Sequence, residues 1–242
     1  MRHYTRVSGA LWLLPVALGD TTWESVLPPA TRDAACRLRH FVVENAKTAR
    51  AELKRLGYPT ALRDLSIEQL PAKPGAAEIE RLLAPLLAGH DLGLMSEAGC
   101  PAVADPGALL VRRAHELEIP VKPMVGPSSL LLALMASGLE GQRFTFHGYL
   151  PTREPERSRR IAELEAESAR QAQTQLFIET PYRNQALFAA LVQACKPGTR
   201  LCVATDISLG SECIATHRII EWGKLATPSL DKRPTVFLLL AA

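Results

Sequence analysis

The most regular hydrophobic pattern lies between residues 78 and 137, where two kinds of apolar segment alternate. Apolar side chains recur at helical spacing in residues 78–89, 108–118 and 128–139, and short apolar or extended runs occupy 91–95 and 119–124. Strands that alternate with helices through short links form parallel sheets joined by right-handed crossovers. This part of the chain therefore predicts an α/β domain whose sheet is covered on both faces.

The pattern continues upstream and changes downstream. Upstream it predicts strands at 10–14 and 39–45 and a polar helix at 46–56 that stops at Gly57. Downstream it predicts helices at 152–170 and 184–195 and strands at 143–150, 174–180, 200–207, 213–222 and 235–242. Such closely spaced strands are typical of a mixed, partly antiparallel sheet. We therefore expect two α/β domains, 1–125 with a mostly parallel sheet and 126–242 with a mixed sheet.

The first twenty residues combine a basic start with an apolar run, as a signal peptide does. The run is short and Pro15 interrupts it, which favours the alternative of a buried strand ending at a Pro/Gly turn. No segment reaches the roughly 18 apolar residues that a membrane-spanning helix needs. We expect a cytoplasmic protein without a membrane segment.

Composition excludes several classes of site. The five cysteines form an odd set without a C-x-x-C pair, and the six histidines show no metal-binding spacing, so we expect neither disulfides nor a metal. There is no G-x-x-x-x-G-K-[ST] and no G-x-G-x-x-G, which disfavours nucleoside triphosphatases and ordinary dinucleotide-binding folds. The net charge of +3 argues against a nucleic-acid-binding tail and is compatible with a polyanionic substrate.

Three Gly/Pro-rich loops follow predicted strands, at 15–20, 96–107 and 125–129. Ligands of parallel sheets bind beyond the carboxyl ends of the strands, where glycine lets the backbone approach them closely. One such loop is usually only a turn, but three at one sheet edge predict a binding site. Asp105 either caps the helix that follows it or contacts the ligand, and Cys100 is better explained as a small filler than as a nucleophile.

Five motifs carry a family resemblance, and in chain order they are PVALGD, SEAGCPAVADPG, VGPSSLLLALMASGL, FHGYLP and FIETPYR. With them the chain resembles, over essentially its whole length, the tetrapyrrole methylase superfamily of S-adenosylmethionine-dependent enzymes. Within it, the chain is most similar to the bacterial 16S ribosomal RNA ribose 2′-O-methyltransferases that act on a cytidine. The resemblance implies two α/β domains with the methyl donor in the cleft between them, a homodimer, and in-line methyl transfer to ribosomal RNA.

The resemblance also implies which residues contact the donor. They are Pro15, Gly19, Ser96, Glu97, Ala98, Gly99, Val103, Ser128, Ser129, Gly148, Leu150 and Pro151. The chain departs from the family at residues 44–47, ENAK in place of E-D-T-R, and at 205–208, TDIS in place of R-E-L-T. Because these departures fall on the substrate side, two alternatives stay open: a tetrapyrrole or other non-RNA acceptor, and a catalytically degenerate module that only binds S-adenosylmethionine.

Catalysis by such an enzyme depends mainly on placement of the acceptor, because a sulfonium donor is already activated. A ribose hydroxyl would still benefit from a nearby base, for which Glu44 and Glu179 are the candidates, followed by Asp105. Glu179 lies four residues before Arg183, so a local ion pair is an equal alternative.

Candidates for binding RNA phosphates are arginines of the second domain. They are Arg153, Arg157 and Arg183, with Arg159 and Arg160 nearby. The alternative is that residues 153–160 form the solvated start of a charged helix. Aromatic side chains near the loops are few, namely Phe146, Tyr149 and Tyr182, so recognition is expected to rest on RNA shape and phosphates.

Overall fold

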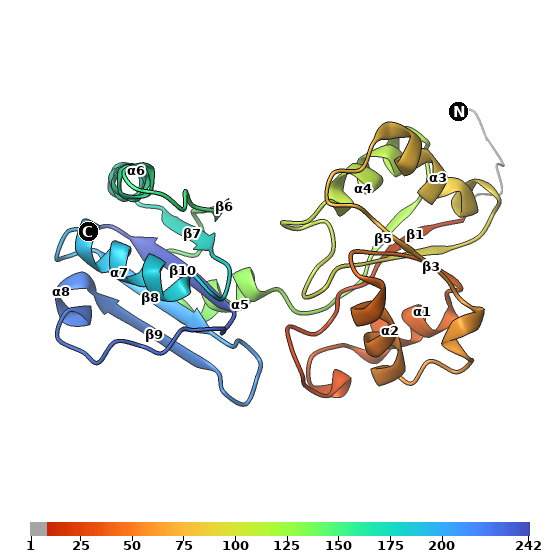
Figure 1. Cartoon of the computed structure of the whole chain (residues 1–242), viewed down its shortest axis with the longest axis horizontal. Coiled ribbons are helices and arrows are strands. Elements are labelled where there is room, and N and C mark those ends of the chain that lie inside the picture. Colours follow the sequence, from red (N-terminus) through yellow and green to blue (C-terminus); the bar gives the residue numbers. More distant parts are fainter. Residues whose placement is uncertain (1–8) are drawn as a thin grey trace. The chain divides into compact units, whose positions relative to one another are not determined.

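The structure, a computed structural model, describes residues 9–242 (Figure 1). The chain divides into two compact units, with the division after Ser128. The basic start of the signal-peptide alternative falls in residues 1–8 and lies outside the described residues. Over residues 9–242, no helix has both the length and the apolar character needed to cross a membrane.

The first unit is an α/β layer structure. Its elements are β1 (Leu11–Leu13), the 3-10 helix η1 (Trp23–Ser25), α1 (Pro29–Arg37), β2 (His40–Val43), α2 (Ala46–Arg55), the 3-10 helix η2 (Leu62–Asp64), β3 (Ser66–Gln69), α3 (Ala76–Leu87), β4 (Leu92–Met95), α4 (Gly107–Glu116) and β5 (Val121–Pro123). The strands form one sheet in the order β3-β2-β4-β1-β5, and all neighbours are parallel. The predicted parallel sheet of the N-terminal domain is therefore confirmed.

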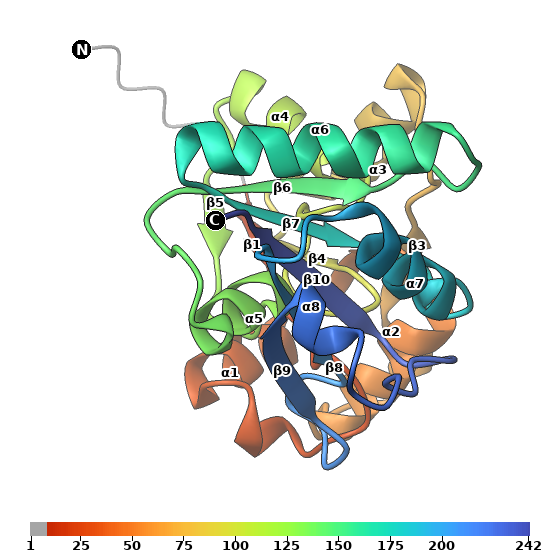
Figure 2. The same cartoon turned by 90° about the vertical axis from the view of Figure 1, so that its left-hand side faces the viewer.

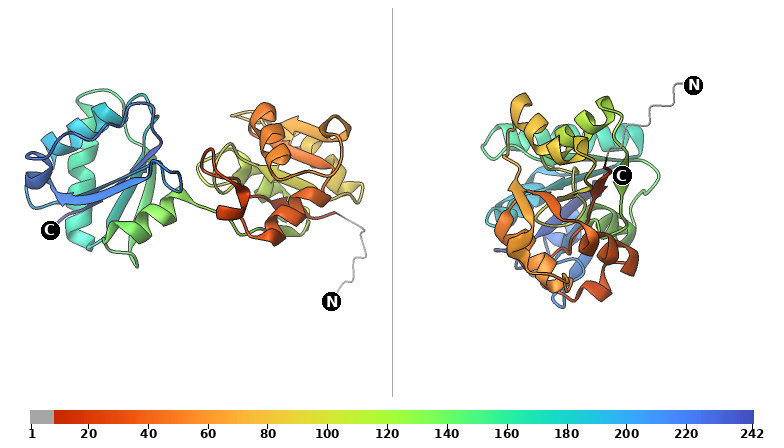
Figure 3. Two further views of the ribbon diagram at one scale, coloured as in Figure 1. Left: turned by 90° about the horizontal axis from the view of Figure 1, so that it is seen from below. Right: turned by 90° about the vertical axis from the view of Figure 1, so that its right-hand side faces the viewer.

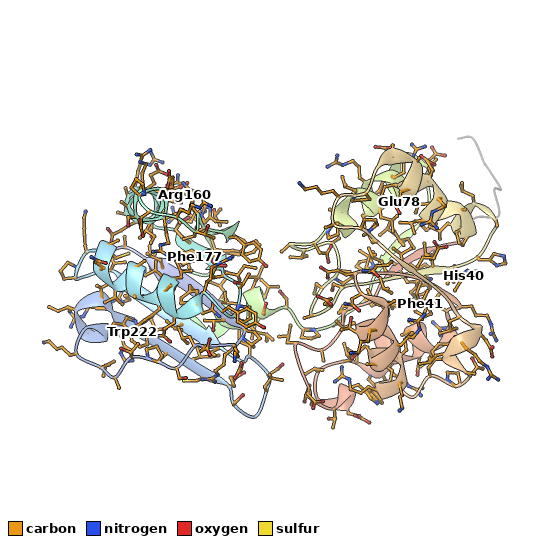
Figure 4. All side chains as sticks on the ribbon, in the orientation of Figure 1. His40, Phe41, Glu78, Arg160, Phe177 and Trp222 are labelled. Atoms are coloured by element: carbon orange, nitrogen blue, oxygen red, sulfur yellow. The ribbon has the colours of Figure 1, made fainter. Side chains whose placement is uncertain are left out.

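Helices cover both faces of this sheet (Figure 1; Figure 3, right). Leu82 and Leu86 of α3 and Leu110 of α4 are completely or nearly completely buried against one face. On the other face, side chains of α1 and α2 pack around Phe41, which Figure 4 labels. The strands are thus apolar on both sides, as a parallel sheet requires.

A topological switch point lies between β1 and β4. The chain leaves β1 towards β2 and leaves β4 towards β5, in opposite directions along the sheet order. Ligands of open parallel sheets bind outside the carboxyl ends of the strands at such a point. The loops that start there are the Gly/Pro-rich segments 15–20 and 96–107.

The second unit contains a mixed sheet. Its elements are α5 (Ser129–Ser137), β6 (Phe144–Tyr149), α6 (Glu156–Gln171), β7 (Thr174–Ile178), α7 (Asn184–Ala194), β8 (Arg200–Thr205), β9 (Cys213–Arg218), α8 (Ile219–Trp222) and β10 (Thr235–Leu240). The strand order is β6-β7-β10-β8-β9, in which β6 and β7 are parallel and the other pairs antiparallel. This confirms the predicted mixed sheet.

The main core of this unit lies on the face covered by α6, α7 and α8 (Figure 2). At its centre Phe177 and Phe237 stack, with ring centroids 6.0 Å apart, and Trp222 packs at its edge (Figure 4). The opposite face is covered by α5, whose Ser137 carbonyl accepts a hydrogen bond of 2.8 Å from the Thr216 hydroxyl of β9. The unit is therefore a sheet with helices on both faces.

Three sequence predictions of local structure need correction. The strand predicted at 213–222 ends at Arg218, and residues 219–222 form α8 because Ile219 and Trp222, three apart, are both buried. The helix predicted from residue 152 starts at Glu156, since the residue before Pro155 is disfavoured in a helix. Helix α1 and strand β3 were not predicted. In contrast, the cap and stop of α2 are as expected: Asn45 accepts the Lys47 and Thr48 N–H groups, and Gly57 has φ +69°.

Candidate functional site

The two loops at the switch point are joined to each other. The Val16 N–H donates to the Gly99 carbonyl at 3.0 Å, and the Gly99 N–H donates to the Val16 carbonyl at 3.2 Å. Gly99 has φ +72°, a conformation that favours glycine. The loops after β1 and β4, predicted separately from the sequence, therefore form one structure.

Neighbouring segments fasten this structure from both sides. The carboxylate of Glu44, just after β2, accepts the Glu97 N–H at 3.0 Å. The Cys100 thiol donates to the carbonyl of Pro127, after β5, at 3.4 Å. Cys100 thus acts as a half-buried packing residue, and burial raises the pKa of its thiol. The loop after β4 is held by the loops of all three neighbouring strand ends.

Asp105 organises the second half of the loop from within. Its carboxylate accepts the Ala102 N–H at 2.9 Å and the Gly107 N–H at 2.8 Å, the latter at the first residue of α4. Ala102 and Ala104 both have positive φ. Burial raises the pKa of Asp105, and the two hydrogen bonds oppose that shift. Of its two predicted roles, the structure supports the one at the helix start.

A pocket of about 400 Å³ opens beside these loops in the first unit. It is lined by Val16, Ala17, Leu18, Gly19, Asp20, Thr48, Ala49, Ala51, Glu52, Arg55, Ser96 and Glu97. Its charged side chains are three carboxylates and one guanidinium, and Arg55 is bound to Glu52 at 2.9 Å and to the Thr21 carbonyl. The pocket wall is therefore acidic and suits a cationic group better than a phosphate.

The predicted donor-contacting residues fall into three places. Gly19, Ser96 and Glu97 line the pocket. Pro15, Ala98, Gly99 and Val103 belong to the same two loops, and Val103 is half exposed. Ser128 and Ser129 stand at the division between the units, and Gly148, Leu150 and Pro151 lie in the second unit, in β6 and directly after it. Their contacts with a donor stay predictions.

Sequence reasoning missed the wall that α2 contributes. Thr48, Glu52 and Arg55 stand on one face of this helix and line the pocket. The only signal was their spacing of four and three residues, which is common in any helix. It also missed Gly126, which sits against Pro15 so closely that an added Cβ would lie 2.3 Å from the proline Cβ.

Glu179, one of the two predicted bases, is held in an ion pair. Its carboxylate accepts the Arg183 guanidinium at 2.7 Å and the Thr180 N–H at 2.6 Å. Burial by itself raises the pKa of Glu179, but the two hydrogen bonds and the charge of Arg183 outweigh it and hold the pKa below its ordinary value. Such a carboxylate is a weak proton acceptor at neutral pH. The ion pair that the sequence offered as an alternative is present.

The ion pair predicts a pH dependence of stability. Because the folded pKa of Glu179 lies below the unfolded value near 4.5, its ionised form stabilises the fold above that pH. This contribution is lost as pH falls through the folded pKa. Urea titrations between about pH 3 and pH 6 should therefore show a steeper loss of unfolding free energy with acid in the wild type than in Glu179→Gln. Arg183→Gln should remove part of the same slope, whereas parallel curves for all three proteins would contradict the assignment.

The predicted phosphate-binding arginines differ in their freedom. Arg157 pairs with Glu154 at 2.7 Å, and Arg183 is engaged as described. Arg160 on α6 (Figure 4) contacts Glu163 at 3.2 Å. Within residues 9–242, Arg153 and Arg159 have no carboxylate within 4.0 Å, and both are exposed. In the part of the chain that the structure describes, no group of three or more His, Cys, Asp or Glu side chains could hold a metal ion.

Comparison with known proteins gives consistent sequence relatives. No family model matches the chain. It is 33% identical over 164 residues to the ribosomal RNA small subunit methyltransferase I of Pseudomonas aeruginosa, covering 66% of this chain and 56% of that protein. Proteins of the same name from Xylella fastidiosa and Neisseria meningitidis are 43% and 36% identical over 104 and 142 residues, which cover 43% and 59% of this chain. The matches span 37% to 56% of the length of these relatives.

A solved structure shares the fold. The methyltransferase CobJ superposes with a TM-score of 0.65 over 97% of this chain and 95% of its own, at 17% identity. Together with the sequence relatives, this confirms the resemblance to the tetrapyrrole methylase superfamily and the α/β fold class.

Proposed function

We propose that this chain, a homologue of the ribosomal RNA small subunit methyltransferases I with the fold of the methyltransferase CobJ, is an S-adenosylmethionine-dependent methyltransferase that acts on a ribose 2′-hydroxyl of ribosomal RNA. The observation that carries the proposal is the joining of two motif-bearing loops, through Val16 and Gly99, at the switch point of a parallel sheet. Switch points are where such sheets bind their ligands.

The chemistry of the pocket supports this donor. S-adenosylmethionine carries a sulfonium and an ammonium group, and the pocket wall carries Asp20, Glu52 and Glu97 against a single arginine that is already paired. Backbone groups of the joined loops offer hydrogen-bonding partners to the rest of a polar donor. Bound there, the donor would supply an activated methyl group. The residues of this chain would bind it and exclude water.

Acceptor placement is the main task left to the protein. A methyl group on a sulfonium needs an in-line acceptor more than it needs a strong base. This fits a site in which Glu179 is held ionised by Arg183 and Glu44 is bonded to a backbone N–H. For the RNA, Arg153 and Arg159 are the cations of the second unit best able to take phosphates, since neither is paired with a carboxylate.

Donor binding gives the first test. The demethylated product S-adenosylhomocysteine, at a hundredfold excess over its dissociation constant, should raise the free energy of unfolding by about 2.7 kcal/mol. The measurement is urea or thermal unfolding with and without the compound, with adenosine triphosphate as the control ligand. Absence of any shift contradicts the proposal at its base.

Acceptor identity needs a second test. Transfer of a labelled methyl group to ribosomal RNA or to assembled small subunits, mapped to a ribose, supports the RNA acceptor. Donor binding with transfer only to a small molecule identifies the alternative acceptor class, and binding without transfer identifies a degenerate module. A homodimer and a cytoplasmic location belong to the same proposal, and light scattering of the purified protein tests the dimer.

A further inference from the structure

Glu44 stands where a hydrogen-bond ladder between two strands runs out. Strands β2 and β4 are paired in register up to Val43 and Met95. The Glu44 N–H adds one more ladder bond by donating to the Met95 carbonyl at 3.1 Å. In a parallel ladder that continued, the carbonyl of Glu44 would next accept the Glu97 N–H.

The backbone cannot make that next bond, because Asn45 already caps α2. Instead, the side chain of the same residue makes it: Glu44 Oε2 accepts the Glu97 N–H at 3.0 Å. A carboxylate is a stronger acceptor than a peptide carbonyl, and its bonds to N–H groups are charge-assisted. Through this bond, Glu44 fixes the direction in which the chain leaves β4.

The consequence reaches the pocket. The two residues that follow β4, Ser96 and Glu97, form part of the pocket wall, and three residues further on Gly99 makes the junction with Val16. We propose that Glu44 is a positioning residue, which holds the start of the 96–107 loop in the donor-binding conformation, and not the general base of the reaction. This inference rests on the proposed function, because it concerns the same site.

Two substitutions separate positioning from base catalysis. Glu44→Gln keeps an acceptor oxygen at the same reach but cannot take a proton, whereas Glu44→Ala removes the acceptor. A positioning role predicts that Glu44→Ala raises the dissociation constant of S-adenosylhomocysteine about tenfold, and that Glu44→Gln stays within about twofold of the wild type. With saturating donor, the pH profile of kcat should be the same in all three proteins.

The measurements are isothermal titration with S-adenosylhomocysteine and, in parallel, thermal unfolding to confirm that each variant is folded. Glu78→Ala is the matched control, since Glu78 lies on the outer surface of α3 (Figure 4) and contacts only Arg81, at 3.6 Å. Its affinity for the product should equal that of the wild type.

The outcomes are distinct. A large loss of kcat in Glu44→Gln with unchanged product affinity, and with loss of the acidic limb of the pH profile, overturns the inference in favour of a general base. Equal product affinity of Glu44→Ala and the wild type also overturns it. Failure of the wild type to bind the product is a failure of the proposed function, and the two failures are therefore distinguishable.

Discussion

Replacing Gly126 with alanine is expected to lower the affinity for S-adenosylhomocysteine about a hundredfold. The added Cβ would lie 2.3 Å from the Cβ and 2.9 Å from the Cγ of Pro15, and 3.0 Å from a methyl group of Leu27. A proline ring cannot rotate out of the way, so one of the two backbones must move. Because Pro15 opens the loop that joins the 96–107 segment at Val16, the displacement passes directly into the proposed binding site.

The effect on folding should be smaller than the effect on binding. Overpacking of this kind costs about 1–3 kcal/mol, which a chain with two separate cores can tolerate. Titration calorimetry measures the affinity, and urea unfolding measures the stability. Gly141→Ala is the matched control, since nothing lies within 4 Å of its added Cβ. Wild-type affinity in Gly126→Ala would show that the loops after β1 and β5 do not shape the donor site.

The fold was predictable from the sequence where hydrophobic period and turn chemistry agree. Strand β4 and helix α4 follow each other with a clear change of period, and Gly57 marks the end of α2. Where one of the two signals is weak, prediction failed. Strand β3 has the sequence SIEQ and only half-buried or exposed side chains, so it lacks an apolar run. Residues 219–222 are apolar enough for either structure, and only burial of Trp222 decides for a helix.

The site was predictable in its loops but not in its walls. Glycine and proline announce a loop through backbone conformation, which is a local property. By contrast, the bond between Glu44 and the Glu97 N–H joins positions 53 residues apart, and no spacing rule contains it. The pocket wall on α2 depends in the same way on how β2 and β4 pair. Thus the sequence identified which segments bind, and the pairing of the strands decides which side chains face the ligand.

Replacing Phe237 with alanine is expected to destabilise the second unit by about 3–5 kcal/mol. Phe237 lies in β10, the central strand of its sheet, and its side chain is fully buried. It stacks on Phe177 at 6.0 Å in the core that α6 and α7 cover. Removing the ring loses its transfer free energy and leaves a cavity that a sheet paired on both sides of β10 cannot close.

Urea unfolding followed by circular dichroism, with hydrogen exchange resolved on peptides of the second unit, measures this loss. Exchange of the β10 and β7 amides should accelerate, while those of β1 and β4 should change little, because the two units have separate cores. Phe144→Ala is the matched control, since its ring is 40% exposed on the edge strand β6, and it should cost about 1 kcal/mol or less. Equal losses in the two variants would mean that β10 is not the centre of the core of this unit.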